Sequence, residues 1–85
     1  MCTMIVGKTP MTGSAKGPEG WFAIDHAYIG YDHPTHTSGE HALTVDFVNE
    51  AVGPGARIAV ELPRASARQL AHQILATLDR SSQYD

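Results

Sequence analysis

The sequence predicts an α+β fold in which a four-stranded antiparallel sheet carries one C-terminal helix packed on one of its faces, a two-layer sandwich. Three observations support this prediction. Four short segments are rich in aliphatic, β-branched or aromatic residues and are separated by glycine, proline or polar stretches. Two of them alternate between apolar and polar residues, and after Pro63 the apolar period changes to a helical one. With 85 residues, the chain is expected to form a single domain over residues 1–85.

The first two strands are predicted from composition. Cys2–Val6 is short and rich in Thr, Ile and Val, which favours a strand. Glycine and proline recur from Gly7 to Gly20, so a long loop is expected there. The second strand is predicted over Trp21–Tyr31, where aromatic and aliphatic residues run without a breaker until Gly30.

The last two strands and the helix are predicted from periodicity. His41–Val48 and Arg57–Leu62 both alternate, as expected of strands with one buried face. The helix is expected from about Ala67 to about Arg80, and Ser66 followed by Gln69 resembles a capping box at its start. Its apolar residues recur at spacings of three and four: Leu70, Ala71, Ile74, Leu75 and Leu78.

The size of the chain predicts self-association. A monomer of this mass hides only about 63% of its unfolded surface and is expected to be marginally stable. One helix covers about 10 Å of a sheet whose four strands span roughly 15 to 19 Å. Because some of the sheet is then left for a partner chain, we predict a homodimer.

Composition excludes several classes of protein. The single cysteine cannot form an internal disulfide, which fits a reducing, cytoplasmic location. The sequence contains no apolar run near the ~20 residues of a membrane span, so no membrane partner is expected. The formal net charge of -3 gives no electrostatic footprint for a phosphate backbone, so no nucleic-acid partner is expected.

The charges are distributed unevenly along the chain. No Lys or Arg lies between Lys16 and Arg57, whereas this interval holds six carboxylates and four of the five histidines. Carboxylates near imidazoles attract cations and protons. This middle third therefore suggests a proton-handling or metal-handling region, although a solvated acidic face is the simpler interpretation.

Several short motifs distinguish the chain from a generic small domain. They are Met1-Cys2-Thr3, Gly20-Trp21-Phe22, Asp32-His33-Pro34, Glu40-His41, Asp46-Phe47-Val48-Asn49 and Gly53-Pro54-Gly55-Ala56-Arg57. With these motifs the chain resembles, over nearly its whole length, a family of short bacterial proteins of unassigned function. The association of some members with natural-product biosynthesis genes implies a small-molecule substrate. The stretch Thr37-Ser38-Gly39 departs from the more apolar spacer of that family.

Three histidines are candidate metal ligands. His33 and His36 lie on one loop and His41 lies at the start of the next strand, so the three imidazoles can supply three donors to a divalent metal such as Zn²⁺ or Fe²⁺. The spacing permits a metal site but does not define one. A metal-free acid/base cluster and an exposed polar loop remain the alternatives.

Three further residues are candidate catalytic groups. His26 shares the parity of Phe22, Ile24 and Tyr28 on the second strand, so we expect it on an apolar face, as a general acid/base or as a structural histidine. If Gly30 pairs with His41, His26 lies ~13 Å from His41 and cannot share a metal with it. Asp32 and Glu40 are candidate bases beside the predicted metal ligands.

Two hypotheses for function follow. The first is a small enzyme that acts on a small molecule, through metal-assisted chemistry or through histidine and carboxylate acid–base chemistry, in a hydrolysis, dehydration or cyclisation. The alternative is a non-catalytic metal- or ligand-binding accessory protein, because 85 residues leave little material for a closed active site.

Overall fold

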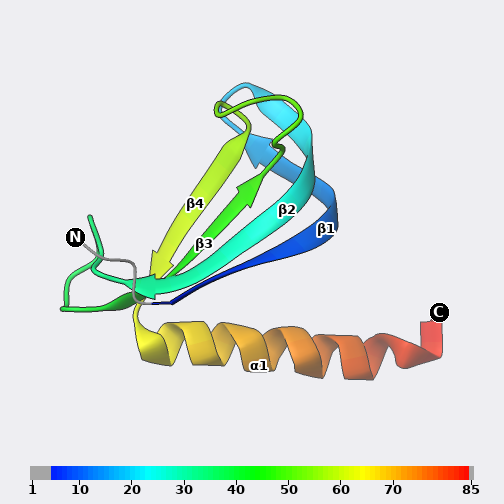
Figure 1. The fold of residues 1–85 in the computed structure, drawn as a ribbon. Helices are drawn as coiled ribbons and strands as arrows, with labels where there is room; N and C mark the ends of the chain where they lie inside the picture. The colour runs from blue at the N-terminus through cyan, green and yellow to red at the C-terminus, as the bar shows by residue number, and fades with distance from the viewer. Residues whose placement is uncertain (1–4, 85) are drawn as a thin grey trace.

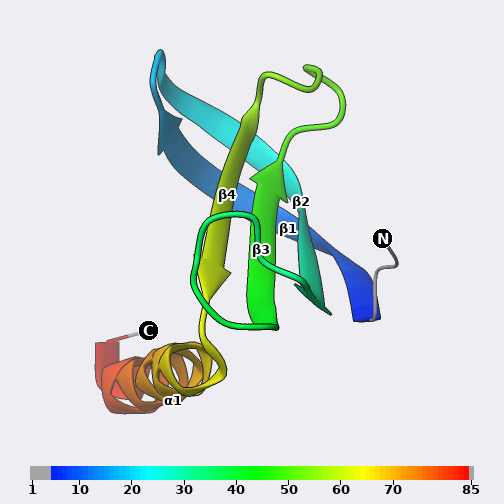
Figure 2. The same cartoon turned by 90° about the vertical axis from the view of Figure 1, so that its left-hand side faces the viewer.

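The computed structural model describes residues 5–84 and confirms the predicted α+β fold (Figure 1). Four strands form one antiparallel sheet in the order β1-β2-β3-β4, and a single long helix follows them. Viewed along the helix axis, α1 lies at the end of the sheet where β4 leads into it (Figure 2). The elements are β1 (Ile5–Gly17), β2 (Gly20–Asp32), β3 (Ala42–Val48), β4 (Arg57–Leu62), α1 (Arg64–Arg80) and a short 3₁₀ turn (Ser81–Tyr84).

The prediction of a long loop over Gly7 to Gly20 was wrong, because β1 continues through most of this segment and pairs with β2. β1 is an edge strand, and an edge strand tolerates Pro10 because one side of its backbone needs no partner. The pairing shifts between Pro10 and Gly13, which marks a bulge, and Gly17 pairs with Gly20 across a two-residue turn. Residues 2–4 of the predicted first strand lie outside the described residues.

The predicted register of β2 against β3 was also wrong. Gly30 pairs with Thr44 and not with His41, and His26 pairs with Val48. The observed partner of Gly30 lies three residues beyond the predicted one. Because side chains alternate between the two faces along a strand, a shift by an odd number of residues changes which residues of β3 share a face with a given residue of β2. His26 therefore lies on the same face as Thr44 and Asp46, and not beside Leu43 and Val45.

The observed register separates an apolar face of the sheet from a polar one. The apolar face looks toward α1 and includes Ala27, Ile29, Tyr31, Leu43, Val45, Phe47, Val60 and Leu62. The opposite face carries polar side chains, which include Tyr28, Asp32, Thr44, Asp46, Arg57 and Glu61, beside the smaller apolar residues Val6 and Ala59. The helix must therefore cover one face, while the other is free to carry polar chemistry.

The helix is attached to the sheet at its N-terminal end. It begins at Arg64 and not at Ala67, and the predicted cap from Ser66 is not formed: Pro63 occupies the N-cap position without a side-chain hydrogen bond. The Arg64 guanidinium donates a hydrogen bond of 2.9 Å to the Tyr31 hydroxyl and lies 4.8 Å from the centre of that ring. The helix ends at Arg80, as predicted.

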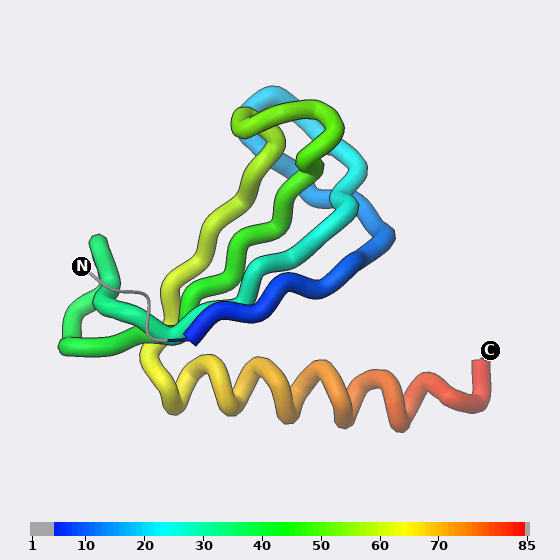
Figure 3. Tube along the Cα trace, in the orientation of Figure 1, coloured from blue at the N-terminus to red at the C-terminus, as the bar shows by residue number. Residues whose placement is uncertain are grey.

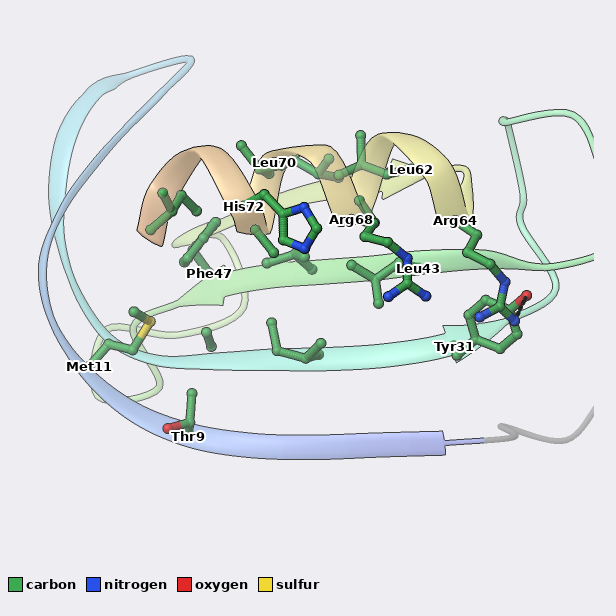
Figure 4. A pocket seen from close by; sticks show the side chains of 17 residues that line it. Thr9, Met11, Tyr31, Leu43, Phe47, Leu62, Arg64, Arg68, Leu70 and His72 are labelled. Atoms are coloured by element: carbon green, nitrogen blue, oxygen red, sulfur yellow. Dashed lines mark hydrogen bonds between the residues drawn. The ribbon is translucent and has the colours of Figure 1, made fainter. Parts of the chain in front are cut away.

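Beyond this attachment the helix and the sheet diverge (Figure 3). They leave between them an apolar wedge of about 630 Å³, lined by the apolar face of the sheet and by one side of α1 (Figure 4). Among residues 5–84 the buried apolar residues are Ala27, Ala42 and Ala56. The packing inside one chain is therefore thin.

The register of β2 depends on the absence of a side chain at Gly30. A Cβ at this position would lie 2.9 Å from the Thr44 hydroxyl oxygen and 3.0 Å from the Ile5 carbonyl oxygen. We predict that Gly30→Ala lowers the free energy of unfolding by about 1–3 kcal/mol, the usual cost of overpacking. Chemical denaturation measures this change. The matched control is Gly55→Ala, where a Cβ meets nothing within 4 Å, and an equal loss in both variants would contradict the prediction.

Candidate functional site

His26 lies between two carboxylates on the polar side of the sheet. Its Nδ1 atom is 3.0 Å from Asp25 Oδ1 and 3.3 Å from Glu50 Oε1. The imidazole is 28% exposed, so it is held in place but remains accessible to solvent. We refer to Lys8, Asp25, His26, Tyr28 and Glu50 as the His26 cluster.

Three segments of the chain assemble the His26 cluster. Lys8 of β1 pairs with Tyr28 of β2, and both contact Glu50 in the loop after β3. The Lys8 ammonium lies 2.9 Å from Glu50 Oε1, and the Tyr28 hydroxyl donates a hydrogen bond to Glu50 Oε2. The Glu50 backbone N–H lies 3.1 Å from both carboxylate oxygens of Asp25. Glu50 is thus the residue through which the cluster is connected.

Both carboxylates of the cluster stay ionised. The hydrogen bond from Tyr28 and the ammonium of Lys8 lower the pKa of Glu50, and the same contact with Glu50 raises the pKa of Lys8. For Asp25, partial burial acts to raise the pKa, but the backbone N–H of Glu50 and the contact with His26 together lower it. Ionised carboxylates only accept hydrogen bonds.

This arrangement defines the hydrogen-bonding role of His26. Because both neighbours of Nδ1 are acceptors, Nδ1 carries a hydrogen and donates it to Asp25. Among residues 5–84, none forms a hydrogen bond with Nε2 of His26. A neutral imidazole in this tautomer presents Nε2 as a base, and the protonated imidazole presents Nε2–H as an acid.

The cluster is also a possible set of metal ligands. Within residues 5–84, Asp25, His26 and Glu50 form the one group of three in which candidate ligand atoms all lie within 4.8 Å of one another. Carboxylate and imidazole donors suit several divalent ions. However, the Lys8 ammonium contacts the same Glu50 oxygen that faces His26, and a metal would have to compete with that charge.

A polar hollow of about 730 Å³ lies on the same face of the sheet. It begins at Tyr28, whose hydroxyl belongs to the His26 cluster, and extends to the loop that joins β2 to β3. Its remaining lining consists of Val6, Gly30, Asp32, His33, Thr35, His36, Thr37, Thr44, Asp46, Arg57, Ala59, Val60 and Glu61. A site of this volume is within the range of small-molecule pockets.

The structure brings two of the three predicted metal ligands together. The rings of His33 and His41 have centroids 5.0 Å apart, and His41 stacks on Tyr31 at 5.6 Å. Nδ1 of His33 donates a hydrogen bond of 2.9 Å to the Glu40 carbonyl oxygen, which leaves Nε2 as its free ring nitrogen. His36 is not part of this pair. Its Nδ1 contacts the Thr35 hydroxyl instead. Binding one metal through all three imidazoles would require the loop to rearrange.

The two predicted bases are not part of the His26 cluster, and of the two only Asp32 lines the polar hollow. Asp32 accepts a hydrogen bond of 2.7 Å from the backbone N–H of His33, so its carboxylate helps to shape the start of the loop. Glu40 uses its backbone carbonyl, as described above, to hold the ring of His33. Their predicted roles as bases stay predictions.

Sequence reasoning missed the residue that holds this loop against the sheet. The Glu61 carboxylate on β4 accepts hydrogen bonds of 2.8 to 3.0 Å from three successive backbone N–H groups, those of Thr35, His36 and Thr37. The Thr35 hydroxyl adds a fourth at 2.8 Å. These donors lower the pKa of Glu61 to about 2. An isolated glutamate on an alternating strand gave no signal of this role.

A comparison with protein-family models identifies the chain as a member of a family. The model of a family of unknown function, DUF6295, matches residues 1–84, and the chain belongs to this family. This confirms the resemblance to short proteins of unassigned function. Neither curated proteins nor solved structures gave a significant match. Within residues 5–84, no helix is long and apolar enough to cross a membrane.

The hydrogen bonds to Glu61 predict a pH dependence of stability. A carboxyl group whose pKa is lowered on folding contributes stability that is fully present above its unfolded pKa of 4.5 and is lost as the pH falls toward its folded value of about 2. We therefore expect the melting temperature of the wild type to exceed that of Glu61→Gln by a constant amount above about pH 5. The difference should narrow as the pH is lowered from 4.5. Thermal unfolding followed by circular dichroism tests this, and a difference that widens on acidification would contradict it.

Proposed function

We propose that this protein is a small enzyme that transfers a proton to or from a small molecule, with His26 as its general acid or base. The observation that carries the proposal is the contact of His26 Nδ1 with two ionised carboxylates, which leaves Nε2 available to a substrate. An imidazole oriented in this way by a carboxylate is a common arrangement for proton transfer.

The other members of the His26 cluster have positioning roles in this proposal. Asp25 holds the tautomer and the orientation of the ring, and Glu50 adds a second acceptor. Lys8 and Tyr28 in turn fix Glu50. When His26 is neutral, the charge on Lys8 compensates one of the two carboxylate charges of the cluster.

The polar hollow is the proposed substrate site. It starts at Tyr28, two residues from His26 on the same face of β2, or roughly 7 Å along the strand. Its acidic side chains outnumber its one arginine, Arg57, which is paired with Asp46 at 3.1 Å. The hollow therefore favours a neutral or cationic polar molecule over an anion. His33 and His36 at its far end offer additional proton donors and acceptors.

Several finer aspects of the sequence hypothesis stay predictions. A metal-assisted reaction through His33, His36 and His41 needs a rearranged loop, and one through Asp25, His26 and Glu50 must overcome the charge of Lys8. The link to natural-product biosynthesis, and the choice among hydrolysis, dehydration and cyclisation, depend on identifying the substrate. The alternative of an accessory protein predicts binding in the polar hollow without turnover.

The proposal predicts that His26→Asn abolishes turnover without unfolding the protein. The asparagine amide can still donate to Asp25 but cannot exchange a proton, so we expect a loss of about 10²-fold or more. The assay incubates purified protein with a polar metabolite extract and follows compounds consumed or formed by mass spectrometry, with and without a chelator. His72→Asn on α1, away from the polar face, is the matched control and should behave as wild type.

Three results would count against the proposal. A compound converted equally by wild type and His26→Asn would show that His26 is not the acid or base. Conversion abolished by the chelator would favour the metal-assisted version. A compound that binds in the polar hollow but is never converted would favour the accessory role.

The geometry also predicts the tautomer of His26. Nitrogen NMR of the neutral imidazole should show the hydrogen of His26 on Nδ1, and a hydrogen on Nε2 would contradict the geometry.

A further inference from the structure

The isolated chain exposes more surface than is usual for a folded monomer of its mass. Its accessible area is 6456 Å², whereas a folded monomer of 9.1 kDa is expected to expose roughly 4,900 Å². The radius of gyration is 14.3 Å, against about 12 Å for a compact domain of this length. Roughly 1,500 Å² of surface is therefore exposed beyond what a self-sufficient fold would leave.

This excess includes two apolar surfaces, the stripe of α1 and the apolar face of the sheet, which adjoin in the wedge at Leu70 and Ile74. Four side chains of α1 are between 49% and 60% exposed: Leu70, Ile74, Leu75 and Leu78. On the apolar face of the sheet Met11, Ile29 and Val60 are each exposed by more than a third. Figure 4 shows Met11, Phe47 and Leu70 around the open wedge. Leu75 and Leu78 do not line the wedge, so an occupant of the wedge alone would leave them uncovered.

We propose that the apolar wedge and the exposed stripe of α1 are two halves of one interface, which a second copy of this chain completes. In the proposed homodimer, the stripe of each α1 packs on the apolar face of the partner sheet, next to the α1 of that chain. The two contacts are related by a two-fold axis, so each chain supplies both a helix and a wedge.

The dimensions of the two surfaces agree. From Leu70 to Leu78 the stripe extends about 12 Å along the helix axis. From Ala27 to Tyr31 the apolar face extends about 13 Å along β2. A dimer that hid the roughly 1,500 Å² of excess surface on each chain would bury about 3,000 Å² in total, within the range of permanent homodimers. A small ligand in a 630 Å³ wedge would cover much less of this surface.

The centre of the wedge is uncharged, and its charged groups lie at its margin. The residues that line the wedge include Arg64, Arg68 and His72 at its margin and no acidic residue. The central part of the wedge is aliphatic and aromatic, so it carries no charge that a partner would have to neutralise. The polar face with the His26 cluster lies on the other side of the sheet, so this dimer leaves the proposed catalytic site open.

Sedimentation equilibrium of the full chain tests the proposal. We expect the wild type to have twice the monomer mass of 9.1 kDa at micromolar concentration. Leu75→Glu should raise the dissociation constant by at least about 30-fold, because it places a charge in the centre of the apolar contact. Gln69→Glu adds the same charge on the opposite side of α1 and should remain dimeric. A monomeric wild type, with or without a co-purified apolar molecule or another protein, would overturn the proposal.

Cross-linking tests the arrangement even if Leu75→Glu fails to fold. In chains carrying Cys2→Ser, one sample contains Met11→Cys on the sheet and the other Leu75→Cys on the helix. After unfolding, mixing and refolding, a short bis-maleimide should link unlike chains, since the helix of one lies on the sheet of the other. A mixture that yields no product with one chain of each kind would overturn this arrangement.

Discussion

The alternation of side chains across β2, β3 and β4 is the constraint on which the rest of the structure depends. In the observed register the odd-numbered residues of β2 and β3 share one face with the even-numbered residues of β4. This gathers the aliphatic residues on the side of α1 and leaves His26 and Tyr28 on the other side. A slip by one residue would mix the two faces. This register leaves no room for a side chain at Gly30, because the Thr44 hydroxyl and the Ile5 carbonyl oxygen lie close to it.

The two faces place different demands on the molecule. The polar face needs no cover. There Glu50, in the loop after β3, contacts both Lys8 of β1 and His26 of β2. The apolar face does need cover, and α1 supplies it only near Tyr31, where Arg64 attaches the helix. Proton chemistry on one side and association on the other can therefore coexist in a chain of 85 residues.

Much of the fold could be predicted from the sequence, because alternation and helical periodicity are local signals. They correctly indicated β3, β4, the core of β2 and the C-terminal end of α1. A first strand was predicted, but the continuation of β1 from Gly7 to Gly17 was missed because its Gly and Pro content resembles that of a loop, and only its position at the sheet edge makes that composition acceptable. The helix start was missed because Pro63 ends β4 and begins α1 with no intervening loop.

The site was harder to predict because it depends on contacts between distant segments. His26 was a candidate from the sequence, but Lys8 becomes its neighbour only if β1 is a strand, and Glu50 only in the correct register of β3. The pairing of His33 with His41 follows from the loop closing on Glu61, for which no local pattern exists. The local sequence thus identified which residues carry the chemistry, but it did not identify the residues that they contact.

The central claim is that the apolar face is completed by a second chain, so that folding and association are one process. The most direct test is equilibrium unfolding of the wild type in urea at protein concentrations spanning a hundredfold range. If unfolding and dissociation are coupled, the stability at a fixed urea concentration should increase by about 1.4 kcal/mol for each tenfold increase in protein, and the midpoint should rise accordingly. A midpoint that does not change with protein concentration would contradict the account.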